Sequence, residues 1–138
     1  KLTLAAMEAT FRLYLDKEKA MKEVPVLNML SQSRDALREK AERLEKMIGH
    51  LRLPLDVHLE DVNSRVGGGA YPEVDLPSVA LVLTSKTMTA EELEIQLRSY
   101  RTPISTRVQN DAVMIDVRTL QPGDENILCE ALISSVEE

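Results

Sequence analysis

The chain has 138 residues, which is enough for one domain with a buried core, and its net charge is −6 at pH 7. This charge argues against a general nucleic-acid-binding surface, because neutralising phosphates requires a clustered excess of Lys and Arg, although a local basic face stays open. The single cysteine, Cys129, excludes an internal disulfide and a cysteine zinc site, so we expect a reducing, cytoplasmic setting. No apolar run has membrane-spanning length and no signal-peptide pattern is present, so we expect no membrane association.

The N-terminal third of the chain carries helical patterns. Over residues 3–15, apolar side chains recur at spacings of three and four, which predicts a helix with one apolar stripe. A short helix is predicted over residues 26–30, and a long amphipathic connecting helix over residues 33–51, which Pro54 ends. The chain begins without Met inside the first helical pattern, and we therefore expect it to be a fragment of a longer protein. The residues of the first apolar stripe are Leu4, Met7, Phe11 and Tyr14.

In the second half of the chain, the apolar period changes to two. Residues 55–60 alternate between apolar and polar side chains, which predicts a strand with one buried face. Residues 79–83 form a continuous apolar run that suits the centre of a sheet. Residues 104–109 and 112–117 predict a hairpin around an Asn110-Asp111 turn.

Two further helices are predicted from local signals. Thr89 and Glu92 have the spacing of a capping box, and Pro122 with the two residues after it opens the last helix. The elements together predict an α+β fold with two parts. Residues 1–53 form a helical lead-in and connecting helix, and residues 54–138 form a small, mostly antiparallel sheet of about four strands covered by helices on one face.

Three of the five glycines are consecutive, Gly67, Gly68 and Gly69, in a segment that Pro72 and Pro77 close. Consecutive glycines remove every β-carbon, so another group can approach the main chain closely. The composition fits a flexible surface loop. The alternative is a loop that passes a ligand or a neighbouring subunit, and the three glycines alone do not decide between these.

Arg107 is the basic residue of most interest. It is predicted to lie in the middle of a strand, on a small polar face with Ser105 and Gln109. Its planar guanidinium could bind a carboxylate or a phosphate through two hydrogen bonds. The alternative is an edge-strand arginine in a surface salt bridge.

The other residues with reactive or ligating side chains favour structural roles. His50 and His58 lack a metal-ligand spacing, and His58 falls on the polar side of its strand. Cys129 has no basic neighbour that would lower the pKa of its thiol. Asp116 and Arg118 share one face and could pair with each other or with a helix end. We therefore expect no catalytic residue, no cofactor-binding residue and no metal site in this chain.

Six blocks of the sequence follow one another in the order found in a known family. The most specific pair consists of Val66–Pro72, which contains the three glycines, and Leu76–Ser78. Together the blocks resemble the C-terminal domain of bacterial L-seryl-tRNA(Sec) selenium transferase, or selenocysteine synthase, and they cover nearly the whole chain. The other four blocks are Lys1–Thr10, Glu23–Leu30, Pro103–Val108 and Ile115–Leu120.

The resemblance implies a fold-type I enzyme that depends on pyridoxal phosphate (PLP), with a large cofactor domain and a small C-terminal domain. Such an enzyme converts seryl-tRNA(Sec) to selenocysteinyl-tRNA(Sec), uses selenophosphate as selenium donor, and forms a cytoplasmic homo-oligomer. The PLP lysine lies upstream of the matching part, so we expect this chain alone to bind no cofactor and to be inactive. Arg107 becomes the candidate for contacting the aminoacyl end or the tRNA 3′ terminus, and Gly67–Gly69 the candidate for close approach to the substrate.

Two alternatives stay open at this point. The parent protein is another fold-type I PLP enzyme, such as a lyase, or the chain is a stand-alone α+β module for oligomerisation or binding. A PLP-type lysine in a large α/β domain before Lys1 would support the enzyme, and a start codon near Lys1 would support the module.

Overall fold

The computed structural model describes residues 1–65 and 75–137, and it divides the chain into two compact units, Lys1–Ser33 and a unit that begins at Arg34. The two domains predicted from the sequence, residues 1–53 and 54–138, stay a prediction for the full-length protein. None of the described helices is long and apolar enough to cross a membrane.

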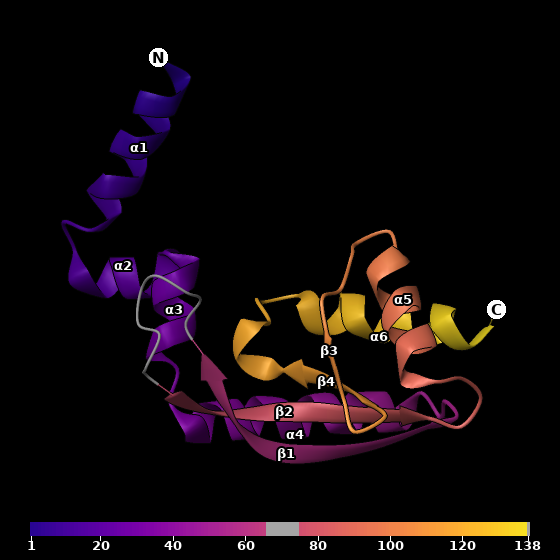
Figure 1. Ribbon diagram of the computed structural model, residues 1–138. Helices are drawn as coiled ribbons and strands as arrows, with labels where there is room; N and C mark the ends of the chain where they lie inside the picture. The colour runs from indigo at the N-terminus through magenta and orange to yellow at the C-terminus, as the bar shows by residue number, and fades with distance from the viewer. Residues whose placement is uncertain (66–74, 138) are drawn as a thin grey trace. The chain divides into compact units, whose positions relative to one another are not determined.

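The first unit consists of three helices, α1 (Leu2–Leu13), α2 (Lys17–Glu23) and α3 (Pro25–Ser31) (Figure 1). The carboxylate of Asp16 caps α2 by accepting a hydrogen bond from the Lys19 backbone N–H at 3.1 Å. Pro25 occupies the first position of α3, where its missing N–H costs no helical hydrogen bond. Two of these helices, α1 and α3, fall where the sequence pattern predicts helix, whereas α2 was not predicted.

The second unit is built on a four-stranded antiparallel sheet with the order β1-β2-β4-β3. The first two strands are long, β1 (Leu55–Arg65) and β2 (Asp75–Ser85), and they pair along their whole length. The last two, β3 (Arg107–Gln109) and β4 (Ala112–Asp116), form a hairpin. The α+β class and the open antiparallel sheet are therefore confirmed.

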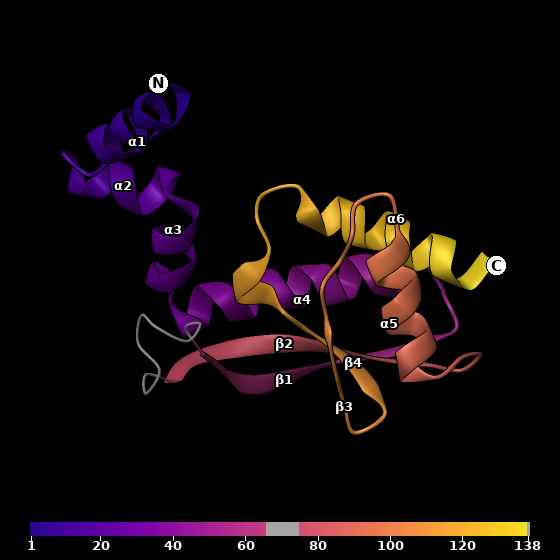
Figure 2. The same cartoon turned by 45° about the horizontal axis from the view of Figure 1, so that its top comes forward.

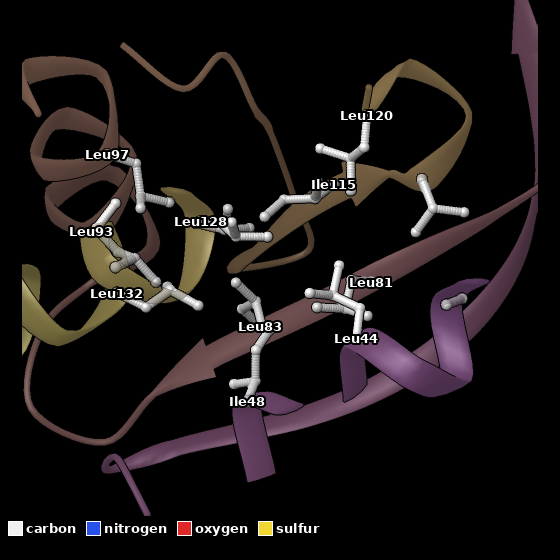
Figure 3. Packing of buried hydrophobic residues seen from close by; sticks show 14 of the residues in the cluster. Leu44, Ile48, Leu81, Leu83, Leu93, Leu97, Ile115, Leu120, Leu128 and Leu132 are labelled. Carbon is white, nitrogen blue, oxygen red and sulfur yellow. The ribbon is translucent and has the colours of Figure 1, made fainter. Parts of the chain in front are cut away.

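Three helices, α4 (Arg34–His50), α5 (Ala90–Ser99) and α6 (Asp124–Glu137), pack on one face of this sheet (Figures 1 and 2). Figure 3 shows side chains from all three helices meeting those of β2 and β4. Burying apolar surface stabilises the folded chain by about 25 cal/mol per Å². The cluster formed by these buried side chains is the main core of the unit. It includes Leu44 and Ile48 of α4, Leu81 and Leu83 of β2, Leu93 and Leu97 of α5, Ile115 of β4, and Leu128 and Leu132 of α6.

The β3–β4 hairpin is confirmed, but β3 is shorter than predicted. Asn110 and Asp111 both have positive φ, of 52° and 58°, as a two-residue type I′ turn requires. The prediction of a strand from Ile104 is wrong because the Ile104 N–H donates to the Leu97 carbonyl at 3.0 Å, at the end of α5. The neighbouring strand, β4, ends at Asp116, and the chain continues as a 3₁₀ helix, η1 (Val117–Thr119).

The face opposite the helices carries a small second apolar cluster. Because residues opposite one another in antiparallel strands share a face, the register places Val82, Met114 and Arg107 side by side on it. Arg107 therefore lies at the outer edge of the face that none of the described helices of this unit covers. The apolar members of the cluster are Val62, Ala80, Val82, Ala112 and Met114.

Candidate functional site

Arg107 lies at a cleft of about 650 Å³ where β1 ends and β2 begins. Its side chain is exposed at the start of the edge strand β3, as predicted. Among the described residues, its guanidinium makes no hydrogen bond or ion pair. The surface salt bridge considered from the sequence is therefore absent from this part of the chain. The residues lining the cleft are Asn63, Ser64, Arg65, Asp75, Ser105, Thr106, Arg107, Met114, Asp116 and Thr119.

The two carboxylates of the cleft already have partners. Asp116 Oδ1 accepts hydrogen bonds from Ser78 Oγ at 2.6 Å and from the Arg118 backbone N–H at 3.0 Å, and Asp116 Oδ2 accepts one from Ser64 Oγ. Asp75 pairs with Arg65 at 3.6 Å. Because Arg65 pairs with Asp75 and the Asp116 oxygens accept from neutral donors, Arg107 is the cation of the lining that is left without a protein partner in the described residues.

The Asp116 network ties together three strands, because Ser64 is on β1, Ser78 on β2 and Asp116 on β4. Arg118 also links η1 to β2, because its guanidinium donates a hydrogen bond to the Pro77 carbonyl at 2.7 Å. Burial lowers the pKa of Arg118, and the nearby Asp116 charge opposes that shift. These hydrogen bonds within the sheet support the structural role expected for Asp116 and Arg118, but Arg118 lies in η1 (Val117–Thr119) and not on the strand.

Hydroxyl groups supply the remaining polarity of the cleft. The Thr106 Oγ1 atom is buried and has no hydrogen-bond partner among the described residues, so it can donate to or accept from a bound group. Together with the Arg107 guanidinium, it suits an anion with planar or tetrahedral oxygens, such as a carboxylate or a phosphate. The described lining contains no His, Cys or Lys, and the two carboxylates that could act as bases, Asp75 and Asp116, are held in the contacts described above.

The other residues weighed from the sequence lie away from this cleft. His58 is exposed on β1, as predicted. Cys129 is half-buried in α6, where burial, and next the Glu125 charge, raise the pKa of its thiol. Among the described residues, no group of His, Cys, Asp and Glu could hold a metal ion. Gly67, Gly68 and Gly69 lie outside the described residues.

Sequence reasoning missed Ser64, Ser78 and Thr106 as parts of this region. The alternating pattern was read only to Glu60, whereas β1 continues to Arg65. Extending the period of two from His58 by three further steps would have placed Ser64 on the same face as His58. Nothing in the sequence indicates the contact between Ser64 and Asp116, which depends on the pairing of three strands.

The fold and the cleft define a small α+β domain with an open antiparallel sheet and a polar cleft, lined by an arginine that has no partner among the described residues. The model of the SelA family, L-seryl-tRNA selenium transferase, matches residues 1–121. The chain belongs to this family of transferases.

Three curated relatives show how much of such a protein this chain represents. It is 40% identical over 131 residues to the L-seryl-tRNA(Sec) selenium transferase of Alkaliphilus oremlandii, which is 95% of this chain and 28% of the relative. The protein of the same name from Alkaliphilus metalliredigens is 39% identical over 132 residues, 96% of this chain and 28% of that relative. The protein of the same name from Desulfotalea psychrophila is 37% identical over 134 residues, which is 96% of this chain and 29% of that relative. The chain thus spans less than a third of the length of these relatives.

Proposed function

We propose that this chain is the C-terminal part of a selenocysteine synthase that converts seryl-tRNA(Sec) to selenocysteinyl-tRNA(Sec) with selenophosphate. The observation that carries the proposal is the family match over residues 1–121, supported by relatives named L-seryl-tRNA(Sec) selenium transferase. We place the full-length protein in the cytoplasm, as a homo-oligomer. Residues 54–138 would be its small domain.

PLP would be held by polypeptide outside this chain. A PLP enzyme of this kind needs a lysine for the covalent attachment, and none of the described residues that line the cleft is a lysine. The residues present therefore do not fit the cofactor, and the 138-residue chain alone would be inactive. Its contribution would be to bind the substrate.

Arg107 is our candidate for that contact. Its guanidinium lacks a partner among the described residues, and Arg107 lines, together with Thr106, a cleft large enough for part of a nucleotide. The carboxylate of the seryl group is esterified in seryl-tRNA, so the anion offered to Arg107 would be a phosphate near the tRNA 3′ terminus. Gly67–Gly69 stay candidates for close approach on composition alone.

The test compares variants of the full-length transferase. Replacing Arg107 by Ala removes charge-assisted hydrogen bonds worth about 1.5–3 kcal/mol, so kcat/KM for seryl-tRNA(Sec) should fall about 10- to 100-fold. Arg107→Lys should recover part of this loss because it keeps the charge without the planar fork. Gln109→Ala is the matched control, since Gln109 is exposed on the same short strand.

Two results would contradict parts of the proposal. Equal kinetics for Arg107→Ala and Gln109→Ala would remove Arg107 from the site. A full-length protein that turns over small amino acids but not seryl-tRNA(Sec) would indicate another fold-type I enzyme, such as a lyase, in place of the synthase.

A further inference from the structure

The first unit exposes most of its large apolar side chains. Of the eleven large hydrophobic residues that are exposed in the described chain, eight lie between Leu2 and Leu30. Only Ala20 and Val24 are buried in this unit, and neither is large enough to found a core. An apolar surface of this kind on a short segment marks an interaction site.

Four of these exposed residues line one surface, which we call the α1 apolar face and define as Leu4, Met7 and Phe11 of α1 with Leu15 just after its end (α1 is labelled in Figure 1). These side chains are 71%, 47%, 61% and 87% exposed, and they line a shallow groove. Glu8 and Arg12 stand at its rim, paired with each other at 2.7 Å. An apolar centre with a polar rim is the anatomy of a protein interface.

A second copy of the chain is a poor occupant for this face. Leu4, Met7, Phe11 and Tyr14 have the 3-4-3 spacing of a coiled-coil seam, but α1 has only 12 residues and a length of about 18 Å. That is fewer than two heptads, whereas a coiled coil is sustained over about three or four. Two such helices could not offset the entropy lost on association.

The second unit is also a poor occupant. Its exposed large hydrophobics in the described residues are Met47, Ile95 and Val108, which lie on three different elements, α4, α5 and β3. The same reasoning applies to the second unit of another copy.

We propose that the α1 apolar face packs against polypeptide of the full-length transferase that lies outside this chain, and that residues 1–33 belong structurally to that part. The relatives support this occupant, because more than two thirds of their length lies outside the matched region. Packing within one polypeptide avoids the entropic cost of association that excludes a helix pair. The inference rests on the proposed full-length transferase and is independent of Arg107.

Amide hydrogen exchange in α1 tests this, measured in the 138-residue chain and in the full-length protein. An isolated 12-residue helix is marginal in water, so its amides should exchange rapidly in the shorter chain. They should exchange at least about 100-fold more slowly in the full-length protein, where packing protects the helix. Equal exchange in the two proteins would overturn the proposal. High protection already present in the 138-residue chain would overturn it too, whether or not that protection depends on concentration.

A pair of variants gives an independent readout. Phe11 and Ile95 are similarly exposed in this structure, at 61% and 56%. In the full-length protein, Phe11→Ala should lower Tm by at least about 5 °C, as expected for truncating a buried aromatic ring, whereas Ile95→Ala should change it by less than about 2 °C. Equal shifts for the two would overturn the proposal. Conversion of seryl-tRNA(Sec) is measured separately, so a protected α1 in an inactive protein would contradict only the proposed function.

Discussion

Replacing Asp116 by Ala should destabilise the second unit strongly, because three hydrogen bonds end on this one carboxylate. Ser78 is 1% exposed, so its hydroxyl would lose its partner without gaining water, at a cost of about 1–2 kcal/mol. The half-buried Ser64 hydroxyl and the Arg118 backbone N–H would add about 0.5–1 kcal/mol each. The expected loss is about 3 kcal/mol, or roughly 10 °C in Tm for a chain of this size.

Urea unfolding of the 138-residue chain, followed by far-ultraviolet circular dichroism, measures this loss in a protein without tryptophan. Asp56→Ala is the matched control, because Asp56 pairs with Lys86 at 2.8 Å on the surface, where both side chains are more than half exposed. An exposed pair of this kind contributes at most about 1 kcal/mol. The double variant with Ser78→Ala should lose about 1 kcal/mol less than the sum of the single changes. The reasoning is refuted if Asp116→Ala costs no more than Asp56→Ala.

Two further predictions concern the hairpin turn and the cysteine. Asp111→Gly should raise the free energy of unfolding by about 0.5–1 kcal/mol in the same urea assay. The reason is that φ of Asp111 is +58°, a backbone conformation that glycine accepts without strain. A loss of stability would show that the Asp111 side chain has an essential contact. Burial raises the pKa of Cys129, so its thiolate should form only at higher pH than in an ordinary cysteine. Iodoacetamide at pH 8 should therefore modify Cys129 in the folded chain on the order of ten times more slowly than in the urea-unfolded chain. Similar rates would show that the thiol is neither shielded nor perturbed.

Local signals predicted the elements whose residues interact with near neighbours. The capping box is confirmed, since Thr89 Oγ1 accepts from the Glu92 backbone N–H at 3.2 Å and the Thr89 N–H donates to Glu92 Oε2 at 2.8 Å. The Asn110-Asp111 turn is confirmed for the same reason, because its backbone conformation is set within two residues. Such interactions are closed by residues that the sequence already places side by side.

The strand limits could not be predicted in this way, because a distant partner determines them. β1 runs five residues past the predicted strand, as far as Arg65, because β2 offers partners along its whole length. β3 begins only at Arg107 because Ile104 is held at the end of α5. The Asp116 network is the extreme case, since Ser64 and Ser78 lie 52 and 38 residues from Asp116 in sequence.

The same network also holds a carboxylate on the sheet face where Arg107 lies. Asp116 is on the same sheet face as Arg107, two residues beyond its cross-strand partner Met114, which is a distance of about 7–8 Å that an arginine side chain can reach. Three hydrogen bonds from Ser64, Ser78 and the Arg118 backbone already occupy the carboxylate, and the described residues contain no ion pair between it and Arg107. The hydroxyls on β1 and β2 thus stabilise the pairing of three strands by binding a carboxylate that has no ion pair with Arg107 among the described residues.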